Sequence, residues 1–264
     1  MEMINEFLRS QGEAASANYA LMGTFGQVLA GMAGVFYLIR MKAKWLDWIK
    51  GVVMILIGFY FCVFAYNFLT WYRTGFALDA YEQVSNLAVS FTMLPLVAWL
   101  CAKTFNTSVG FAGDAITLFM LGFHTLGRSG CVFGGCCYGF PCDWGIYSRY
   151  TQANQFPVCI VESLFTLGIF IFILVRICRK GYTPDGRNLP WFLLLYGTCR
   201  FFSEMTRESA SQFWLFWRIS DVHIHMLVMA ALGGYLLYRN TRRAKAAAVS
   251  AAEPQLPELS GVRH

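Results

Sequence analysis

Several ionisable residues lie within or at the ends of long apolar segments, where a charge is costly, and five of them could carry chemistry. They are His124, Arg128, Glu162, Arg200 and Glu204. Ionisable side chains in membrane-spanning segments usually face a polar cavity and serve function. Arginine keeps its charge in such a cavity and grips phosphate oxygens with paired N–H groups. These residue types therefore indicate an anion site, and a phospholipid headgroup is the anion available at that depth.

The spacing of the charges predicts two charged helix faces. His124 and Arg128 are four residues apart, and Arg200, Glu204 and Arg207 follow one another at intervals of four and three. Residues at these intervals share one face of a helix. We expect the two faces to meet in one polar cavity.

A glycine-rich segment follows His124, with the sequence GRSGCVFGGCCYG over residues 127–139. Its five glycines let the backbone approach a ligand closely and present amide groups to an anion. Because Arg128 lies inside this segment, we expect the segment to contribute to the same anion site.

The elements that position these residues are predicted to be membrane helices. The chain has 264 residues, of which 57% are hydrophobic and only 14% charged, which excludes an ordinary soluble domain. Apolar runs that could each cross a bilayer lie near residues 19–39, 51–71, 84–101, 113–126, 158–177, 189–203 and 222–238. We therefore expect an all-α, polytopic membrane bundle of seven helices, in which the fourth helix continues through His124 and Arg128.

Domain boundaries and orientation follow from the same pattern. Residues 1–243 are predicted to form one transmembrane domain, and residues 244–264 a disordered cytoplasmic tail. The loops after spans one, three, five and seven carry most of the Lys and Arg residues. Because cytoplasmic loops are enriched in these cations, we expect the N-terminus outside and the C-terminus in the cytoplasm.

Three stretches of the chain resemble the prolipoprotein diacylglyceryl transferase family. Arg128, Gly130 and Gly139 match a signature in which Gly-Arg-x-Gly-Asn is followed by Glu and closes on Gly. Residues 196–204 are similar to the family's Tyr-Gly-x-x-Arg-Phe-x-x-Glu stretch, and residues 157–162 to its Pro-x-Gln-x-x-Glu segment.

The chain departs from the family pattern at several positions. Cys131 stands where the signature has Asn, Cys136 where it has Glu, and Cys159 where Gln is usual. The third apolar run lacks the histidine that the family carries there. The resemblance is therefore to a divergent member, in which His124 is our candidate for the missing imidazole.

The resemblance implies an enzyme and a reaction. A diacylglyceryl group would move from phosphatidylglycerol to the thiol of a prolipoprotein signal-peptide cysteine or another thiol acceptor, releasing glycerol phosphate, with no cofactor, no metal and no nucleic-acid partner. The enzyme would be a multi-pass protein of the bacterial cytoplasmic (inner) membrane. The expected catalytic residues are His124 as base, Arg128 and Arg200 on the phosphate, and Glu204 holding Arg200. The expected substrate-binding residues are Tyr19, Gly130, Gly139, Glu162 and Arg207.

Two other functions compete with the transferase. Cys131, Cys136, Cys137 and Cys142 lie within twelve residues and would suit a membrane thiol–disulfide oxidoreductase. Such enzymes usually carry a C-x-x-C pair, which this chain lacks. The third possibility is a noncatalytic lipid-binding protein that keeps the headgroup pocket without the chemistry.

Overall fold

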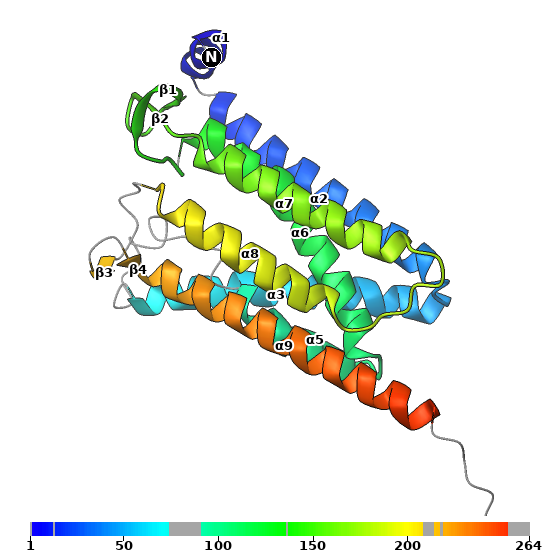
Figure 1. Ribbon diagram of the computed structural model, residues 1–264. Coiled ribbons are helices and arrows are strands. Elements are labelled where there is room, and N and C mark those ends of the chain that lie inside the picture. Colours follow the sequence, from blue (N-terminus) through cyan, green and yellow to red (C-terminus); the bar gives the residue numbers. More distant parts are fainter. Residues whose placement is uncertain are drawn as a thin grey trace, which may run out of the picture.

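The computed structural model describes residues 2–12, 14–73, 91–135, 137–207, 214–216 and 219–252. Within these ranges most of the chain is helical (Figure 1). The helices are α1 (Glu2–Ser10), α2 (Ala14–Arg40), α3 (Trp45–Arg73), α5 (Leu94–Thr104), α6 (Val109–Gly134), α7 (Val158–Cys178), α8 (Asn188–Glu204) and α9 (Asp221–Ala252), with a 3-10 turn at Phe91–Met93.

The helices coincide with the apolar runs of the sequence. Six of the seven runs fall inside α2, α3, α6, α7, α8 and α9, and the third overlaps α5 but begins at residues 84–90, outside the described residues. Among the described residues, three helices, α2, α6 and α7, are long and apolar enough to cross a membrane. The prediction of an α-helical membrane protein is therefore confirmed, whereas the number of seven spans stays a prediction.

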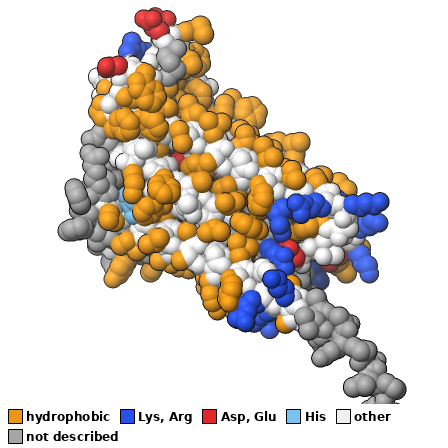
Figure 2. All heavy atoms as spheres, in the orientation of Figure 1, with side chains coloured by type: hydrophobic (Ala, Val, Ile, Leu, Met, Phe, Trp, Pro, Cys, Tyr) orange, Lys and Arg blue, Asp and Glu red, His pale blue; other side chains and the backbone are white. Residues whose placement is uncertain are grey.

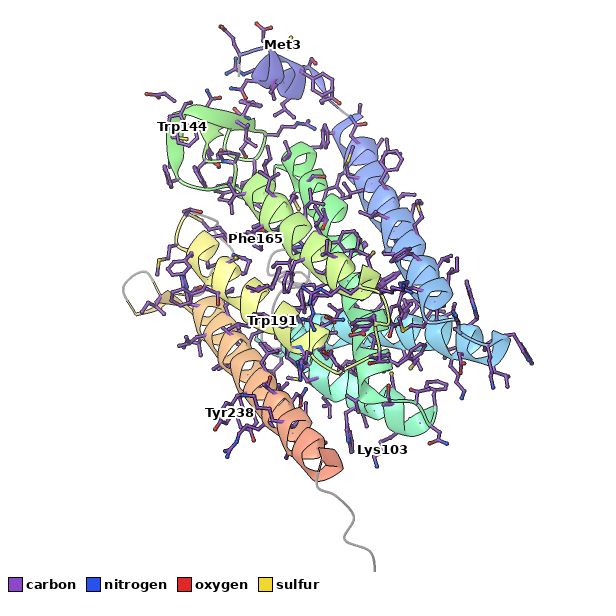
Figure 3. All side chains as sticks on the ribbon, turned by 45° about the vertical axis from the view of Figure 1, so that its right-hand side comes forward. Met3, Lys103, Trp144, Phe165, Trp191 and Tyr238 are labelled. Atoms are coloured by element: carbon purple, nitrogen blue, oxygen red, sulfur yellow. The ribbon has the colours of Figure 1, made fainter. Side chains whose placement is uncertain are left out.

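Two short antiparallel hairpins were not expected from the sequence. Strand β1 (Pro141–Ser148) pairs with β2 (Ala153–Gln155), and β3 (Trp214–Phe216) pairs with β4 (Ile219–Ser220). Figure 3 places Trp144, which lies in β1, at one end of the bundle and Lys103 at the other. The first hairpin therefore lies at the end of the bundle where the glycine-rich segment leaves α6.

Helix α6 is the central helix. In its most apolar stretch 72% of the residues are buried, against 33% in α2. Ser108 caps its first turn by accepting a hydrogen bond from the backbone N–H of Phe111 at 3.0 Å, and Gly135, with φ of 64°, ends it in the left-handed conformation. A Cβ atom on Gly122 would lie 2.8 Å from Ala30 Cα of α2. Glycine therefore permits the close α2–α6 contact.

The outer surface of the bundle is apolar along its length (Figure 2). Large side chains such as Leu164, Ile171 and Val175 on α7, and Leu227 and Val228 on α9, are exposed. Soluble monomers rarely expose continuous apolar surface of this extent. The surface agrees with a helix bundle that is surrounded by lipid.

Lysine and arginine side chains gather at the end of the bundle where α9 ends (Figure 2). Helix α9 continues as far as Ala252, so residues 244–252 of the segment that we expected to be a disordered tail are helical. Residues 253–264 lie outside the described residues.

Candidate functional site

Glu162, one turn into α7, is the hub of a buried ion-pair cluster. Its side chain is fully buried, and Oε1 lies 3.2 Å from Arg200 Nη1 and 3.1 Å from Arg207 Nη2. Its other oxygen, Oε2, accepts a hydrogen bond from Arg128 Nε and lies 3.2 Å from Arg207 Nη2. One carboxylate therefore joins arginines from α6, from α8 and from the segment that follows α8.

Glu204 completes this arrangement, which we call the arginine cluster: Arg128, Glu162, Arg200, Glu204 and Arg207. Glu204 pairs with Arg200 one turn away and lies 3.5 Å from Arg207 Nε. Three guanidinium groups and two carboxylates leave one net positive charge in the ionised cluster. The sequence prediction that Glu204 holds Arg200 agrees with this contact, but the central position of Glu162 was not predicted.

Arg207 is positioned by backbone pairing beyond the end of α8. Residue 207 forms an isolated antiparallel bridge with Gly139, and Phe140 N–H donates to Thr206 C=O at 3.1 Å. A Cβ atom on Gly139 would lie 2.7 Å from that same carbonyl oxygen. Gly139, which we expected to bind substrate, is thus placed where it holds the segment that carries Arg207.

Gly130 and Tyr19 lie where α6 packs on α2. A Cβ atom on Gly130 would lie 3.1 Å from Tyr19 C=O and 3.0 Å from Met22 Cβ. The side chain of Tyr19 is 46% exposed at this end of α2. Gly130 therefore allows the two helices to approach beside Arg128, a packing role that substrate-binding motifs alone do not predict.

His124 lies one turn before Arg128 on α6, as its spacing predicted, but it packs among aromatic rings. Its Nε2 atom lies 3.3 Å from the Tyr196 hydroxyl, and its Nδ1 atom lies 3.4 Å from Thr166 Oγ1. The imidazole also packs edge-on against Phe91, with ring centroids 5.6 Å apart. His124 is therefore adjacent to the arginine cluster rather than one of its ion-paired members.

The sequence analysis gave no role to Tyr196, the first residue of the matched stretch, or to Ser203, although both have close contacts here. Tyr196 is fully buried beside His124, and the Ser203 hydroxyl lies 3.3 Å from both Arg200 Nη1 and Glu162 Oε1. Both residues lie within one turn of Arg200 on α8, so helical spacing around that arginine was the signal that could have found them.

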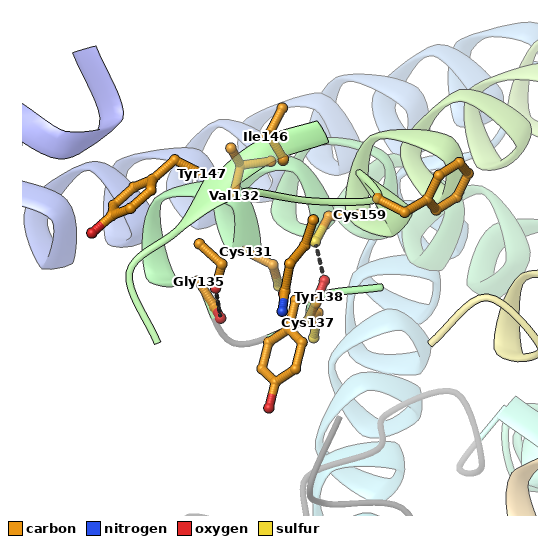
Figure 4. Close-up of a pocket in the computed structure, with 11 residues that line it drawn as sticks. Cys131, Val132, Gly135, Cys137, Tyr138, Ile146, Tyr147 and Cys159 are labelled. Atoms are coloured by element: carbon orange, nitrogen blue, oxygen red, sulfur yellow. Dashed lines mark hydrogen bonds between the residues drawn. The ribbon is translucent and has the colours of Figure 1, made fainter. Parts of the chain in front are cut away.

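Two thiols contact the guanidinium group of Arg128, and a third thiol lies beside them. Arg128 Nη1 lies 3.0 Å from Cys137 Sγ and 3.5 Å from Cys131 Sγ. Cys159 of α7 donates from its thiol to Cys137 C=O at 2.8 Å. Figure 4 shows these residues around a cavity of about 20 Å³, a volume that holds one water molecule. The sequence grouped Cys131 and Cys137 with other cysteines of their segment, and the structure adds Cys159 to them.

The other two cysteines that the sequence grouped with Cys131 and Cys137 have no described contact with Arg128. Cys136 lies outside the described residues. Cys142 is in β1, where burial and the neighbouring Asp143 raise the pKa of its thiol and favour the unreactive, protonated form. Among the described residues, no three His, Cys, Asp or Glu side chains are arranged to hold a metal ion.

The fold and the site together define a class of protein: a membrane helix bundle that buries a net-positive, arginine-rich site. The chain belongs to the prolipoprotein diacylglyceryl transferase family, whose model matches residues 19–239. This match confirms the resemblance that the motifs around Arg128, Glu162 and Arg200 indicated.

Individual relatives agree with the family match. A phosphatidylglycerol–prolipoprotein diacylglyceryl transferase from Polynucleobacter asymbioticus is 32% identical over 144 residues, which cover 53% of this chain and 55% of the relative. Relatives of the same name from Chlorobaculum tepidum and Dehalococcoides mccartyi are 30% identical over 160 residues and 29% over 110. These alignments cover 58% and 39% of this chain, and 55% and 42% of the relatives. The chain thus spans about half the length of the relatives it matches.

Proposed function

We propose that this protein transfers the diacylglyceryl group of phosphatidylglycerol to the thiol of a prolipoprotein lipobox cysteine and releases glycerol phosphate. Membership of the family supports the reaction, and the convergence of Arg128, Arg200 and Arg207 on Glu162 is the observation that carries it. The oxidoreductase and the noncatalytic lipid-binding protein have no comparable support from relatives.

The proposed setting is the bacterial cytoplasmic membrane, crossed seven times, with the N-terminus outside. The gathering of cations at the end where α9 ends supports this orientation (Figure 2), because cytoplasmic loops favour Lys and Arg. The arginine cluster then lies in the half of the bundle that faces away from the cytoplasm, where a translocated signal peptide would meet it.

The charge of the arginine cluster suits the donor lipid. Three guanidinium groups offer five N–H donors each, and two carboxylates accept only some of them. The net charge of one positive matches the single negative charge of a phosphodiester. As the carbon–oxygen bond breaks, the departing glycerol phosphate gains negative charge, which the same guanidiniums stabilise in a poorly hydrated site.

The two carboxylates position the arginines. Glu162 and Glu204 each contact two or more guanidinium groups, and three like charges at this separation would otherwise repel. Every ion pair that Glu162 makes among the described residues is with a guanidinium group. Glu162 is therefore assigned to holding Arg128, Arg200 and Arg207 rather than to proton transfer.

His124 remains the proposed base. Among the described residues, the imidazole contacts the hydroxyl groups of Thr166 and Tyr196 rather than a carboxylate, so it takes no part in the ion pairs of the arginine cluster. The acceptor thiol loses its proton to the imidazole and attacks the glyceryl carbon that bears the phosphate. A sulfur–carbon bond forms, the carbon–oxygen bond breaks, and the proton leaves with the glycerol phosphate.

An assay with a separate readout for each product tests the proposal. Purified protein would be incubated with phosphatidylglycerol in detergent and a lipobox peptide, and both glycerol phosphate release and the diacylglyceryl mass on the peptide would be measured. We expect both products, in equal amounts. Release of glycerol phosphate without peptide modification would contradict the proposed acceptor, and the absence of both products would contradict the transferase.

A further inference from the structure

A second polar cavity lies near the opposite end of α6 from the arginine cluster. It has a volume of about 690 Å³ and is lined by α5, α6, α8, α9 and the loop between α7 and α8. Sites for small molecules commonly measure roughly 300–1,000 Å³. Its wall combines apolar Trp99 and Leu236 with charged Asp114, Arg239 and Arg243. Part of the wall therefore suits a hydrocarbon chain and part a polar group.

Asp114 supplies an acceptor to this cavity. The residue is fully buried, and its Oδ2 atom accepts hydrogen bonds from the hydroxyls of Tyr182 at 2.7 Å and Tyr37 at 3.4 Å. The other oxygen, Oδ1, has no hydrogen-bond partner among the described residues. A buried acceptor without a donor costs free energy, so this wall fits a ligand that brings a hydroxyl or another N–H or O–H donor.

Two arginines supply the opposite charge. Arg239 and Arg243 are one turn apart on α9, so they share a helix face, and both line the cavity. Arg239 Nε is buried without a hydrogen-bond partner among the described residues. Asp185 also lines the cavity, but its carboxylate is already paired, at 3.1 Å with Arg176 and at 3.6 Å with Arg187. Because these two partners balance the charge of Asp185, the guanidinium groups of Arg239 and Arg243 are opposed only by Asp114 among the described residues of the wall, which favours a ligand with net negative charge.

We propose that this cavity binds the glycerophosphate headgroup of an anionic phospholipid, at a site distinct from the arginine cluster. The phosphate lies against Arg239 and Arg243, a glycerol hydroxyl donates to Asp114 Oδ1, and the acyl chains pass over Trp99 and Leu236. Trp99 is 48% exposed on the apolar surface of the bundle, which gives the chains a route into the surrounding lipid. The inference does not rest on the transfer reaction, because no residue of the cavity belongs to the arginine cluster.

Counting bound lipids by native mass spectrometry tests the site. The full-length protein would be released from micelles that contain dioctanoyl phosphatidylglycerol, beside the double variant Arg239→Gln/Arg243→Gln. We expect the parent to retain one more lipid than the double variant, while transferase turnover stays within about twofold. Equal lipid counts would overturn the proposal.

Arg242→Gln is the matched control. Arg242 is exposed beside Arg243, but its Nη1 atom donates to the Tyr238 hydroxyl at 3.1 Å and it does not line the cavity. This variant should retain the parent's lipid count, and a loss here would show that α9 charge in general, rather than the cavity, holds the lipid. Arg243→Gln alone, at an exposed position that folding tolerates, should weaken the site at least threefold.

Two further ligands separate the possible sources of the glycerophosphate group. Free glycerol phosphate should bind at least tenfold more weakly than the dioctanoyl lipid, and equal affinity would assign the cavity to a soluble ester and overturn the lipid proposal. Dioctanoyl phosphatidylcholine has no headgroup donor for Asp114 and no net charge. It should also bind at least tenfold more weakly, and equal binding would contradict the recognition described here.

Discussion

A buried carboxylate lies near each end of α6, and the two carboxylates have opposite kinds of partner. Arg128 and Asp114 are 14 residues apart on this helix, about 21 Å at 1.5 Å per residue. At the Arg128 end, Glu162 is in contact with three guanidinium groups. At the Asp114 end, the carboxylate accepts hydrogen bonds from tyrosine hydroxyls, and two arginines line the same open cavity without an ion pair to it among the described residues.

This difference in partners indicates a different function for each site. In the arginine cluster the charges are fixed before any ligand arrives, so charge that develops during a reaction is stabilised without rearrangement of the protein. In the second cavity the acceptor, Asp114, forms no ion pair with the donors, Arg239 and Arg243, in the described part of the chain. A ligand that carries both a phosphate and a hydroxyl could therefore bind to all three residues at once. The first arrangement suits catalysis, and the second suits binding.

The largest effect is expected for Arg200→Ala in the arginine cluster. Arg200 is 1% exposed and touches both Glu162 and Glu204. Its removal leaves two buried carboxylates with less compensation, at a cost of roughly 3–5 kcal/mol of unfolding free energy, and lowers turnover by about 10²–10³-fold. Thermal unfolding and the transfer assay measure both quantities.

Arg200→Lys is the matched control for that variant. It keeps the charge but not the two-pronged geometry, so it should recover stability more fully than turnover. Full turnover in Arg200→Ala would show that the arginine cluster is structural only, and the contrast between the two ends of α6 would disappear.

A smaller effect, on turnover rather than stability, is expected for His124→Gln. General bases contribute roughly 10²–10⁴-fold to rate, whereas glutamine can still reach the hydroxyls of Thr166 and Tyr196 that contact the imidazole. Turnover should fall by about 10²-fold while the melting temperature changes by only a few degrees. A variant that keeps its turnover across the pH range would exclude His124 as the base.

At the other end of α6, Asp114→Asn should change stability slightly and leave turnover almost unchanged. Tyr182 lies outside the helices, where burial and Asp114 raise the pKa of its hydroxyl, so it stays a hydrogen-bond donor at neutral pH. An asparagine oxygen still accepts that bond, and we expect a loss of about 1 kcal/mol with turnover within about twofold. A hundredfold loss of turnover would show that the two ends of α6 are coupled, against the separation drawn here.

The smallest effect is expected for Cys137→Ser. Its thiol lies 3.0 Å from Arg128 Nη1, and a serine hydroxyl at that position can still accept from the guanidinium. Transfer should stay within about 1.5-fold of the parent, with Cys142→Ser as a control at a thiol away from the arginine cluster. Complete loss in Cys137→Ser alone would favour thiol chemistry of the protein's own cysteines.

The sequence predicted most of the helices and the local charge pairs. Apolar runs located six helices because burial in lipid requires long continuous hydrophobic segments. The Arg200–Glu204 contact followed from a spacing of four residues. The continuation of α6 through Arg128 was also predicted and is confirmed.

Contacts between distant segments could not be predicted in the same way. Glu162 contacts Arg128, Arg200 and Arg207 only because of the way α6, α7 and α8 pack. The spacing of residues along the sequence does not predict that packing. The packing positions of Gly130 and Gly139, the β1–β2 hairpin and the approach of Cys159 to Cys137 have the same origin. The resemblance to the family pointed to most of these residues. It did not distinguish residues that would contact a ligand from residues that position the backbone.

The central claim is that the arginine cluster stabilises phosphate during transfer to a thiol. The most direct measurement is single-turnover transfer from phosphatidylglycerol to a lipobox peptide by the parent protein, Arg200→Lys and Arg239→Gln/Arg243→Gln. The account predicts a large loss of rate in Arg200→Lys and a nearly unchanged rate in the double variant. Equal rates in all three proteins would contradict it.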